Sequence, residues 1–75
     1  MENDLVIADF RVEGTNELEE MLESAVRTAR HRALVDRTRG ALVTRHDFGH
    51  FSVALSPKVP FGFTREHDSA GSRRD

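Results

Sequence analysis

Residues 41–55 read ALVTRHDFGHFSVAL, and this stretch contains the clearest secondary-structure pattern of the chain. Polar and apolar side chains alternate on both sides of Asp47-Phe48-Gly49, which predicts two strands joined by a tight turn. A three-residue loop that ends in glycine is typical of a type I turn whose last residue is left-handed, and such a turn fixes the strand register. We therefore expect a β-hairpin in which His46 lies opposite His50.

The two faces of this hairpin differ in polarity. Because side chains alternate along a strand, one face is expected to meet the core and the other to be mostly polar. The core-side residues are Ala41, Val43, Phe51, Val53 and Leu55, and those of the opposite face are Leu42, Thr44, His46, His50, Ser52 and Ala54.

A further strand is predicted near the N-terminus. Residues 5–12 read LVIADFRV and alternate with the period of two that a half-buried strand requires. Alternation puts Val6, Ala8, Phe10 and Val12 on the face that meets the core, and Leu5, Ile7, Asp9 and Arg11 on the opposite face.

A long helix is predicted between this strand and the hairpin. Apolar residues recur every three or four positions from Leu18 to Ala33, which aligns them along one side of a helix. Asn16 has a glutamate three positions later, which is the form of a reciprocal N-terminal cap. Gly40 is a typical residue after a helix end, so we expect the helix to cover about residues 17–37.

These elements make an α+β fold in the order β-α-β-β. A right-handed crossover places the helix on one face of a small antiparallel-type sheet. We prefer the strand order 1-3-2, and the alternative places the first strand beside the second. One helix leaves the second face and both edges of the sheet open, so we expect a homodimer that covers Leu5, Ile7 and Leu42, or Phe61 and Phe63.

The chain changes character after the hairpin. Pro57 and Pro60 end regular strand pairing. The segment from Val59 to Thr64 is apolar enough to pack on the body as an ordered arm or a short edge strand. Residues 69–75 lack a large apolar side chain, so we expect a disordered tail behind a single domain of residues 1–68.

Composition restricts the class of protein. The chain has 75 residues, of which 37% are hydrophobic and 32% are charged, and this is typical of one small globular domain. It contains no cysteine, which excludes a disulfide framework and a thiolate metal site. No stretch is apolar enough to cross a membrane, and the acidic start is unlike a secretion signal, so we expect a cytoplasmic protein.

Charge is sorted along the chain, although the net charge is only −2. Residues 1–23 carry eight acidic side chains and one arginine, whereas residues 24–46 carry six arginines and one aspartate. Such an arginine cluster can neutralise nucleic-acid phosphates, and it also matches the dipole of the helix that carries part of it. The candidate nucleic-acid-binding residues are Arg27, Arg30, Arg37, Arg39 and Arg45.

The histidine pair at the hairpin is the strongest candidate for chemistry. In the expected register His46 and His50 are close enough to share a metal ion, but a zinc site needs a third protein ligand, and the spacing supplies none. Thr44 and Ser52 share their face, yet a flat strand face has no pocket for an oxyanion. We therefore expect no catalytic residue, no bound metal and no cofactor.

The C-terminal part of the chain carries a resemblance to known proteins. The residues concerned run from Val43 to Gly62, including the turn and the motif Ser56-Pro57-Lys58-Val59-Pro60-Phe61-Gly62, and continue from Thr64 to Asp68. They resemble short uncharacterised proteins of high-GC actinobacteria and their phages. That family has no assigned activity, so the resemblance implies only a context, namely an accessory protein of a phage or mobile element that binds a host protein.

The expected function is that of a small, non-enzymatic, protein-binding accessory or regulatory protein. A nucleic-acid-binding regulator that uses the arginine cluster is the alternative. Salt distinguishes the two, because phosphate binding weakens steeply as the salt concentration rises. The predicted partner-binding residues lie on the hairpin and the arm, and they are Phe48, His46, His50, Phe61 and Phe63.

Overall fold

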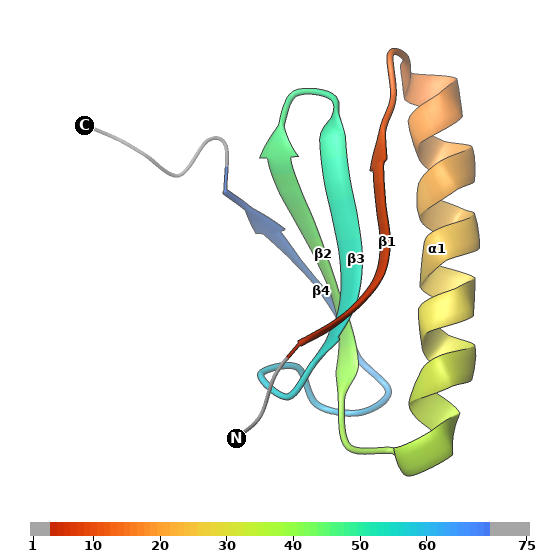
Figure 1. Ribbon diagram of the computed structural model, residues 1–75, viewed down its shortest axis with the longest axis vertical. Helices are drawn as coiled ribbons and strands as arrows, with labels where there is room; N and C mark the ends of the chain where they lie inside the picture. The colour runs from red at the N-terminus through yellow and green to blue at the C-terminus, as the bar shows by residue number, and fades with distance from the viewer. Residues whose placement is uncertain (1–3, 70–75) are drawn as a thin grey trace.

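The computed structural model describes residues 4–69 of the chain. The four strands form one sheet in the order β1-β3-β2-β4, and α1 packs on one face of it (Figure 1). The predicted α+β fold, the strand order 1-3-2 and the single long helix are therefore confirmed. The elements are β1 (Leu5–Arg11), α1 (Thr15–Asp36), β2 (Gly40–Asp47), β3 (His50–Ser56) and β4 (Thr64–Asp68).

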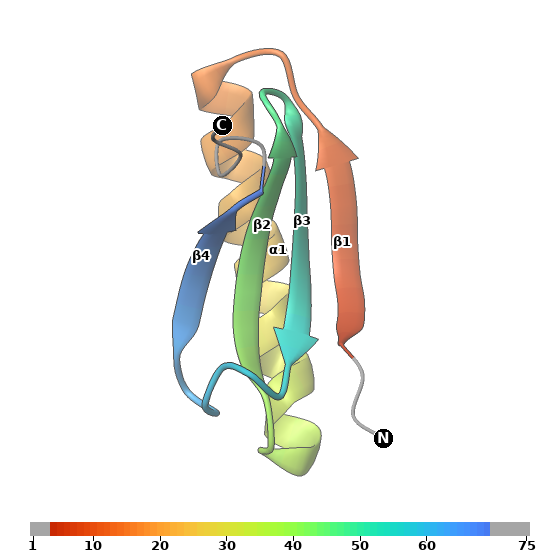
Figure 2. The ribbon, with the colours of Figure 1, turned by 90° about the vertical axis from the view of Figure 1, so that its left-hand side faces the viewer.

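A fourth strand makes the sheet mixed. β1, β3 and β2 are antiparallel neighbours, whereas β4 pairs with β2 in parallel. The segment after β3 turns the chain back at one end of the sheet, so that Thr64 enters beside Ala41 (Figure 2). The sequence predicts a packed arm or edge strand over residues 59–64, and the edge strand forms farther along, at Thr64–Asp68. Residues 70–75 of the predicted tail lie outside the described residues.

The helix begins two residues earlier than the sequence predicts. Its N-cap is Gly14, which has extended backbone angles and makes no side-chain cap. The predicted cap residue Asn16 lies inside the helix instead. Glu17 helps to fix this end, because its carboxylate accepts a hydrogen bond from the backbone N–H of Glu13 at 3.2 Å. An acidic residue in the first turn also matches the helix dipole.

The C-cap residue of α1 is Arg37, and not a glycine. Arg37 adopts the left-handed conformation (φ 57°, ψ 34°), and its N–H donates to the carbonyl of Ala33 at 2.8 Å. Gly40 is instead the first residue of β2, where it is buried against the segment between β3 and β4. A Cβ atom there would overlap the carbonyl oxygen of Pro60, so this close approach requires glycine.

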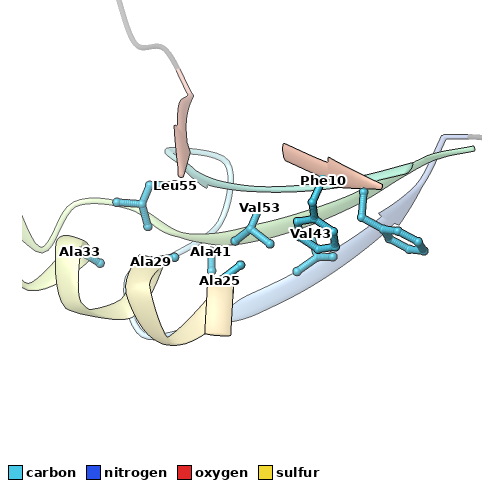
Figure 3. Packing of buried hydrophobic residues seen from close by; sticks show 9 residues of the cluster. Phe10, Ala25, Ala29, Ala33, Ala41, Val43, Val53 and Leu55 are labelled. Carbon is cyan, nitrogen blue, oxygen red and sulfur yellow. The ribbon is translucent and has the colours of Figure 1, made fainter. Parts of the chain in front are cut away.

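The core lies between α1 and the sheet. The buried residues of α1 are alanines, which let the helix backbone approach the strands closely (Figure 3). The predicted core side of the hairpin is confirmed, since all five of its residues are buried. β1 joins the core through Phe10, whose ring stacks on Phe51 with centroids 6.2 Å apart. The buried cluster comprises Phe10, Ala25, Ala29, Ala33, Ala41, Val43, Phe51, Val53 and Leu55.

A β-bulge changes the two faces of β1. The register with β3 shifts between Val6 and Ala8, which makes Ile7 an extra residue. The predicted placement of Val6 on the core side is wrong, because its side chain is 60% exposed. Leu5 and Ile7, which were expected to serve a dimer interface on the opposite face, pack against the core. The pairing with β3 places Leu5, Ala8 and Phe10 on the helix side, and Val6, Asp9 and Arg11 on the other side.

The sheet face that points away from α1 is here called the open face (Figure 2). Within residues 4–69 no element covers it, and no helix has the length and apolarity that crossing a membrane requires. Register places on it Val6, Asp9, Arg11, Leu42, Thr44, His50, Ser52, Ala54, Arg65 and His67. His46 joins them through its side-chain contact with Ser52.

Candidate binding surfaces

The predicted partner-binding residues lie at two ends of the sheet. Phe48 is in the turn between β2 and β3, with the two histidines beside it. Phe63 lies at the start of β2, where its carbonyl accepts a hydrogen bond from the N–H of Ala41 at 3.0 Å. β2 has eight residues, so at about 3.3 Å per residue the two groups are roughly 25 Å apart. The structure therefore does not join them into one surface.

The hairpin turn is tighter than the sequence predicts. Asp47 pairs with His50, and Arg45 pairs with Phe51, so His46 forms a bulge. The predicted direct opposition of His46 and His50 is wrong, whereas the register from the Arg45–Phe51 pair outward is confirmed. Phe48 remains exposed at the tip (85%), with its ring centroid 5.5 Å from the guanidinium carbon of Arg45.

The histidines still lie together on the open face. Their ring centroids are 4.7 Å apart. His46 Nε2 lies 2.8 Å from Ser52 Oγ, and His50 Nε2 lies 2.7 Å from Asp9 Oδ1. Both rings are thus held by side chains of β1 or β3, and the cluster links the three antiparallel strands. Over residues 4–69, no three potential metal ligands gather into a group that would hold an ion.

Asp9 is the member of this cluster that sequence reasoning missed. Its contact with His50 joins residues that are 41 positions apart. Alternation places Asp9 on the face away from the core, and the structure confirms this, but alternation along one strand does not show which residue of another strand Asp9 contacts. The strand order 1-3-2 could have indicated this contact, because it makes β1 and β3 neighbours and brings Asp9 opposite Ser52.

Most of the predicted nucleic-acid-binding arginines are paired with carboxylates. Three pairs have N–O distances of 3.0 to 3.5 Å. Ion pairing of this kind competes with phosphate for the same guanidinium groups. The pairs are Arg27 with Glu23, Arg39 with Asp36, and Arg45 with Asp68.

Asp36 is held by residues that follow the helix. Its Oδ1 accepts hydrogen bonds from the backbone N–H (3.2 Å) and the hydroxyl (3.0 Å) of Thr38. These two hydrogen bonds, followed by the charge of Arg39, hold the pKa of Asp36 below its usual value of 3.8. The carboxylate nearest to Arg37 in the sequence is therefore engaged elsewhere.

An apolar pocket of about 240 Å³ lies beside the C-cap of α1. We call it the C-cap pocket. Leu34 lines it and is 53% exposed, so this side chain lies at the mouth where the pocket meets solvent. The pocket lining comes from three separate parts of the chain, with Ala33 and Leu34 in α1, Ala41 and Leu55 in the sheet, and Phe61 and Phe63 in the connecting segment.

Positive charge borders the C-cap pocket. Arg30 lines it directly, and the guanidinium carbon of Arg37 lies 5.9 Å from the ring centroid of Phe61, which is also part of the lining. In the part of the chain that the structure describes, no carboxylate lies within ion-pair distance of Arg30 or Arg37. The pocket is therefore apolar inside and cationic at its border.

Two further hollows continue from this pocket along the β4 side of α1. The first lies between Val26 and Val43, and the second between Leu18 and Phe51. They exist because α1 packs on β1, β2 and β3, while across the described residues no Cα atom of α1 lies within 8 Å of one in β4. A groove therefore runs beside the helix from the C-cap pocket toward the N-terminal turns.

The comparisons with known proteins supply no relative. The resemblance to short actinobacterial and phage proteins therefore stays a prediction. No family model, no curated protein and no solved structure matches the chain.

Proposed function

We propose that this chain is a non-enzymatic protein-binding module, with an accessory or regulatory role, that recognises its partner through the C-cap pocket. The observation that carries this proposal is an apolar pocket whose border holds Arg30 and Arg37, to which residues 4–69 supply no carboxylate. An apolar side chain of the partner fills the pocket, and acidic side chains next to it meet the arginines. Aromatic and arginine side chains of this kind are enriched at binding hot spots.

The backbone of Arg37 supports a role for its side chain. A residue other than glycine in the left-handed conformation costs about 1 kcal/mol, and helices commonly end with glycine at this position. The chain nevertheless holds an arginine here, with its guanidinium over Phe61. This arginine places a positive charge beside the C-cap pocket, which a glycine at the same position would not provide.

The groove along α1 gives the partner segment room to continue. Its floor contains Leu22, Val26 and Val43, and Glu66 borders it on the β4 side. A segment with an apolar residue at one end and further apolar residues along its length fits this shape. We propose that the acidic residues of the partner lie at the end that reaches Arg37.

The alternative of a nucleic-acid-binding regulator has weaker support. Three of its five arginines are engaged with carboxylates, and phosphate would have to displace them. Arg45 also pairs next to the hairpin turn, at the end of β2 far from Arg37. The arginines that lack a carboxylate partner border an apolar pocket, which suits a protein segment better than a phosphate backbone.

Selection from a displayed library of random peptides tests this proposal on the intact chain. We expect the selected peptides to combine an apolar or aromatic residue with neighbouring Asp or Glu. Leu34→Lys, which puts a charge at the mouth of the pocket, should abolish their binding. Val35→Lys is the matched control, because Val35 is the next residue of α1, is 82% exposed and does not line the pocket.

Three results would contradict the proposal. The first is selected peptides without any preference for acidic residues, and the second is an equal loss of binding in both lysine variants. The third is a double-stranded oligonucleotide that binds more tightly than the peptides, with an affinity that falls steeply as salt rises. That last result would support the nucleic-acid alternative.

A further inference from the structure

The two edges of the sheet differ in composition. β4 forms one edge with the sequence TREHD, and all five of its residues are exposed. Charged side chains on an edge strand discourage pairing with another chain. β1 forms the other edge (Figure 2), and its sequence begins with four apolar residues, LVIA. The backbone N–H and C=O groups on the outer side of β1 can therefore pair with a further strand, because the first half of β1 carries no charged side chain.

Exposed apolar side chains lie on both sides of the β1 edge. Val6 is exposed on the open face of β1 itself. On α1, Met21 and Val35 are exposed and are separated by about four helical turns, so they lie on the same flank. Arg27 and Arg30 line the hollows on the β4 side, which places the Met21 flank on the side of β1.

From this placement we propose that β1 pairs antiparallel with β1 of a second copy of the chain, which joins the two sheets into one. The charges at the ends of the strand select the direction. Asp4 precedes β1 and Arg11 ends it. A two-fold axis brings each Asp4 beside Arg11 of the second copy, whereas a parallel arrangement puts like charges together.

The bulge in β1 makes this register consistent with the faces of the strand. Directly opposed residues of antiparallel strands carry their side chains on the same face. Because Ile7 is an extra residue, Leu5 and Phe10 both lie on the helix side. By the same alternation, Asp4 and Arg11 both belong to the open face. Without the bulge, Asp4 and Arg11 would lie on opposite faces and could not meet.

This interface leaves the proposed binding surface free. The C-cap pocket and its groove lie on the β4 side of α1, whereas the second copy joins at β1. The dimer therefore does not depend on the proposed function, and either proposal can fail alone. Removing the apolar β1 edge from water also adds buried area that a domain of this size lacks.

Sedimentation equilibrium of the untagged chain tests the dimer. We expect the wild type to have twice the chain mass of 8.5 kDa. Arg11→Glu places a second acid beside Asp4 twice in each dimer, so the dissociation constant should rise about tenfold. The double variant Asp4→Arg, Arg11→Glu exchanges the two charges and should restore the wild-type value. Circular dichroism of each variant confirms that it is folded.

Arg65→Glu is the matched control for these variants. It makes the same charge change on an exposed residue of the opposite edge strand, β4. Its dissociation constant should stay within twofold of the wild type. A chain that is monomeric up to its solubility limit overturns the proposal. So do an unchanged constant in Arg11→Glu, a failure of the double variant to restore pairing, and an equal weakening by Arg65→Glu.

Discussion

The guanidinium of Arg45 binds the carboxylate of Asp68 through two hydrogen bonds, 3.2 Å from Nε to Oδ1 and 3.0 Å from Nη2 to Oδ2. These residues are direct neighbours in the register of β2 and β4. Because every side chain of β4 is exposed, the strand has little apolar packing, and this bidentate pair fixes its last residue on the sheet.

Removal of this pair should loosen β4 first. We expect Asp68→Ala to lower the free energy of unfolding by about 0.5–1 kcal/mol, because both partners are partly exposed. Amide hydrogen exchange in β4 should become faster, while exchange in β3 stays unchanged. Glu66→Ala in the same strand is the control. Equal acceleration of exchange by both variants would mean that Arg45 does not hold the strand.

Gly40 should tolerate no larger residue. A Cβ atom there would overlap the carbonyl oxygen of Pro60 and lie 2.6 Å from Val59 Cγ1. Since this contact includes backbone, Gly40→Ala should destabilise the protein by about 1–3 kcal/mol in urea denaturation. Gly14→Ala is the control, because a Cβ atom at Gly14 meets nothing within 4 Å. A cost at Gly40 no greater than at Gly14 would contradict the close approach.

The contact between Asp9 and His50 should couple β1 to β3. A double-mutant cycle with Asp9→Ala and His50→Ala should give a coupling free energy of about 0.5–1.5 kcal/mol, the range for a hydrogen bond of this kind. His67 lies on the same face without a hydrogen bond among the described residues, so Asp9→Ala and His67→Ala should be additive. A coupling energy near zero in the first cycle would show that the 2.7 Å contact adds no stability.

Acid should weaken the end of α1 through Asp36. Its pKa in the folded chain is lowered, first by the backbone N–H of Thr38 and then by the Thr38 hydroxyl. A lowered pKa means that the carboxylate stabilises the fold above its usual value of 3.8, and that this contribution is lost as pH falls through the lowered pKa. An NMR titration should place the Asp36 midpoint below 3.8, and Thr38→Val should raise it. A midpoint that Thr38→Val leaves unchanged would contradict this cause.

Local patterns were enough to predict the hairpin, the helix and the order of the first three strands. Alternation fixed the buried faces of β2 and β3, and the spacing of Ala25, Ala29 and Ala33 fixed the buried side of α1. Both patterns arise because buried positions carry apolar residues, and the residue types can be read from the sequence alone. The helix end near residue 37 was predicted, but Arg37 was not predicted as its left-handed cap, because glycine, the usual residue for that conformation, stands three positions later.

The features that local patterns missed depend on pairing between distant residues. The bulge at Ile7 is invisible in the alternation of β1 and forms only against β3. β4 has no apolar alternation, and it is a strand because the edge of β2 supplies its hydrogen-bonding partners. The C-cap pocket is formed by three separate segments, so no local pattern predicts it. The sequence hinted at it only through apolar residues outside the buried stripe of the helix, namely Leu34 and the aromatic residues Phe61 and Phe63.

In the proposed function, the positive border of the C-cap pocket recognises an acidic partner segment. The most direct measurement compares Arg30→Glu with Arg32→Glu in binding the selected peptides, by isothermal titration calorimetry. Both variants make the same charge change on exposed residues of α1, but only Arg30 lines the pocket. We predict that Arg30→Glu weakens binding about tenfold, while Arg32→Glu stays within about threefold. Equal weakening by both variants would contradict the claim, because affinity would then follow the net charge of the helix and not the pocket.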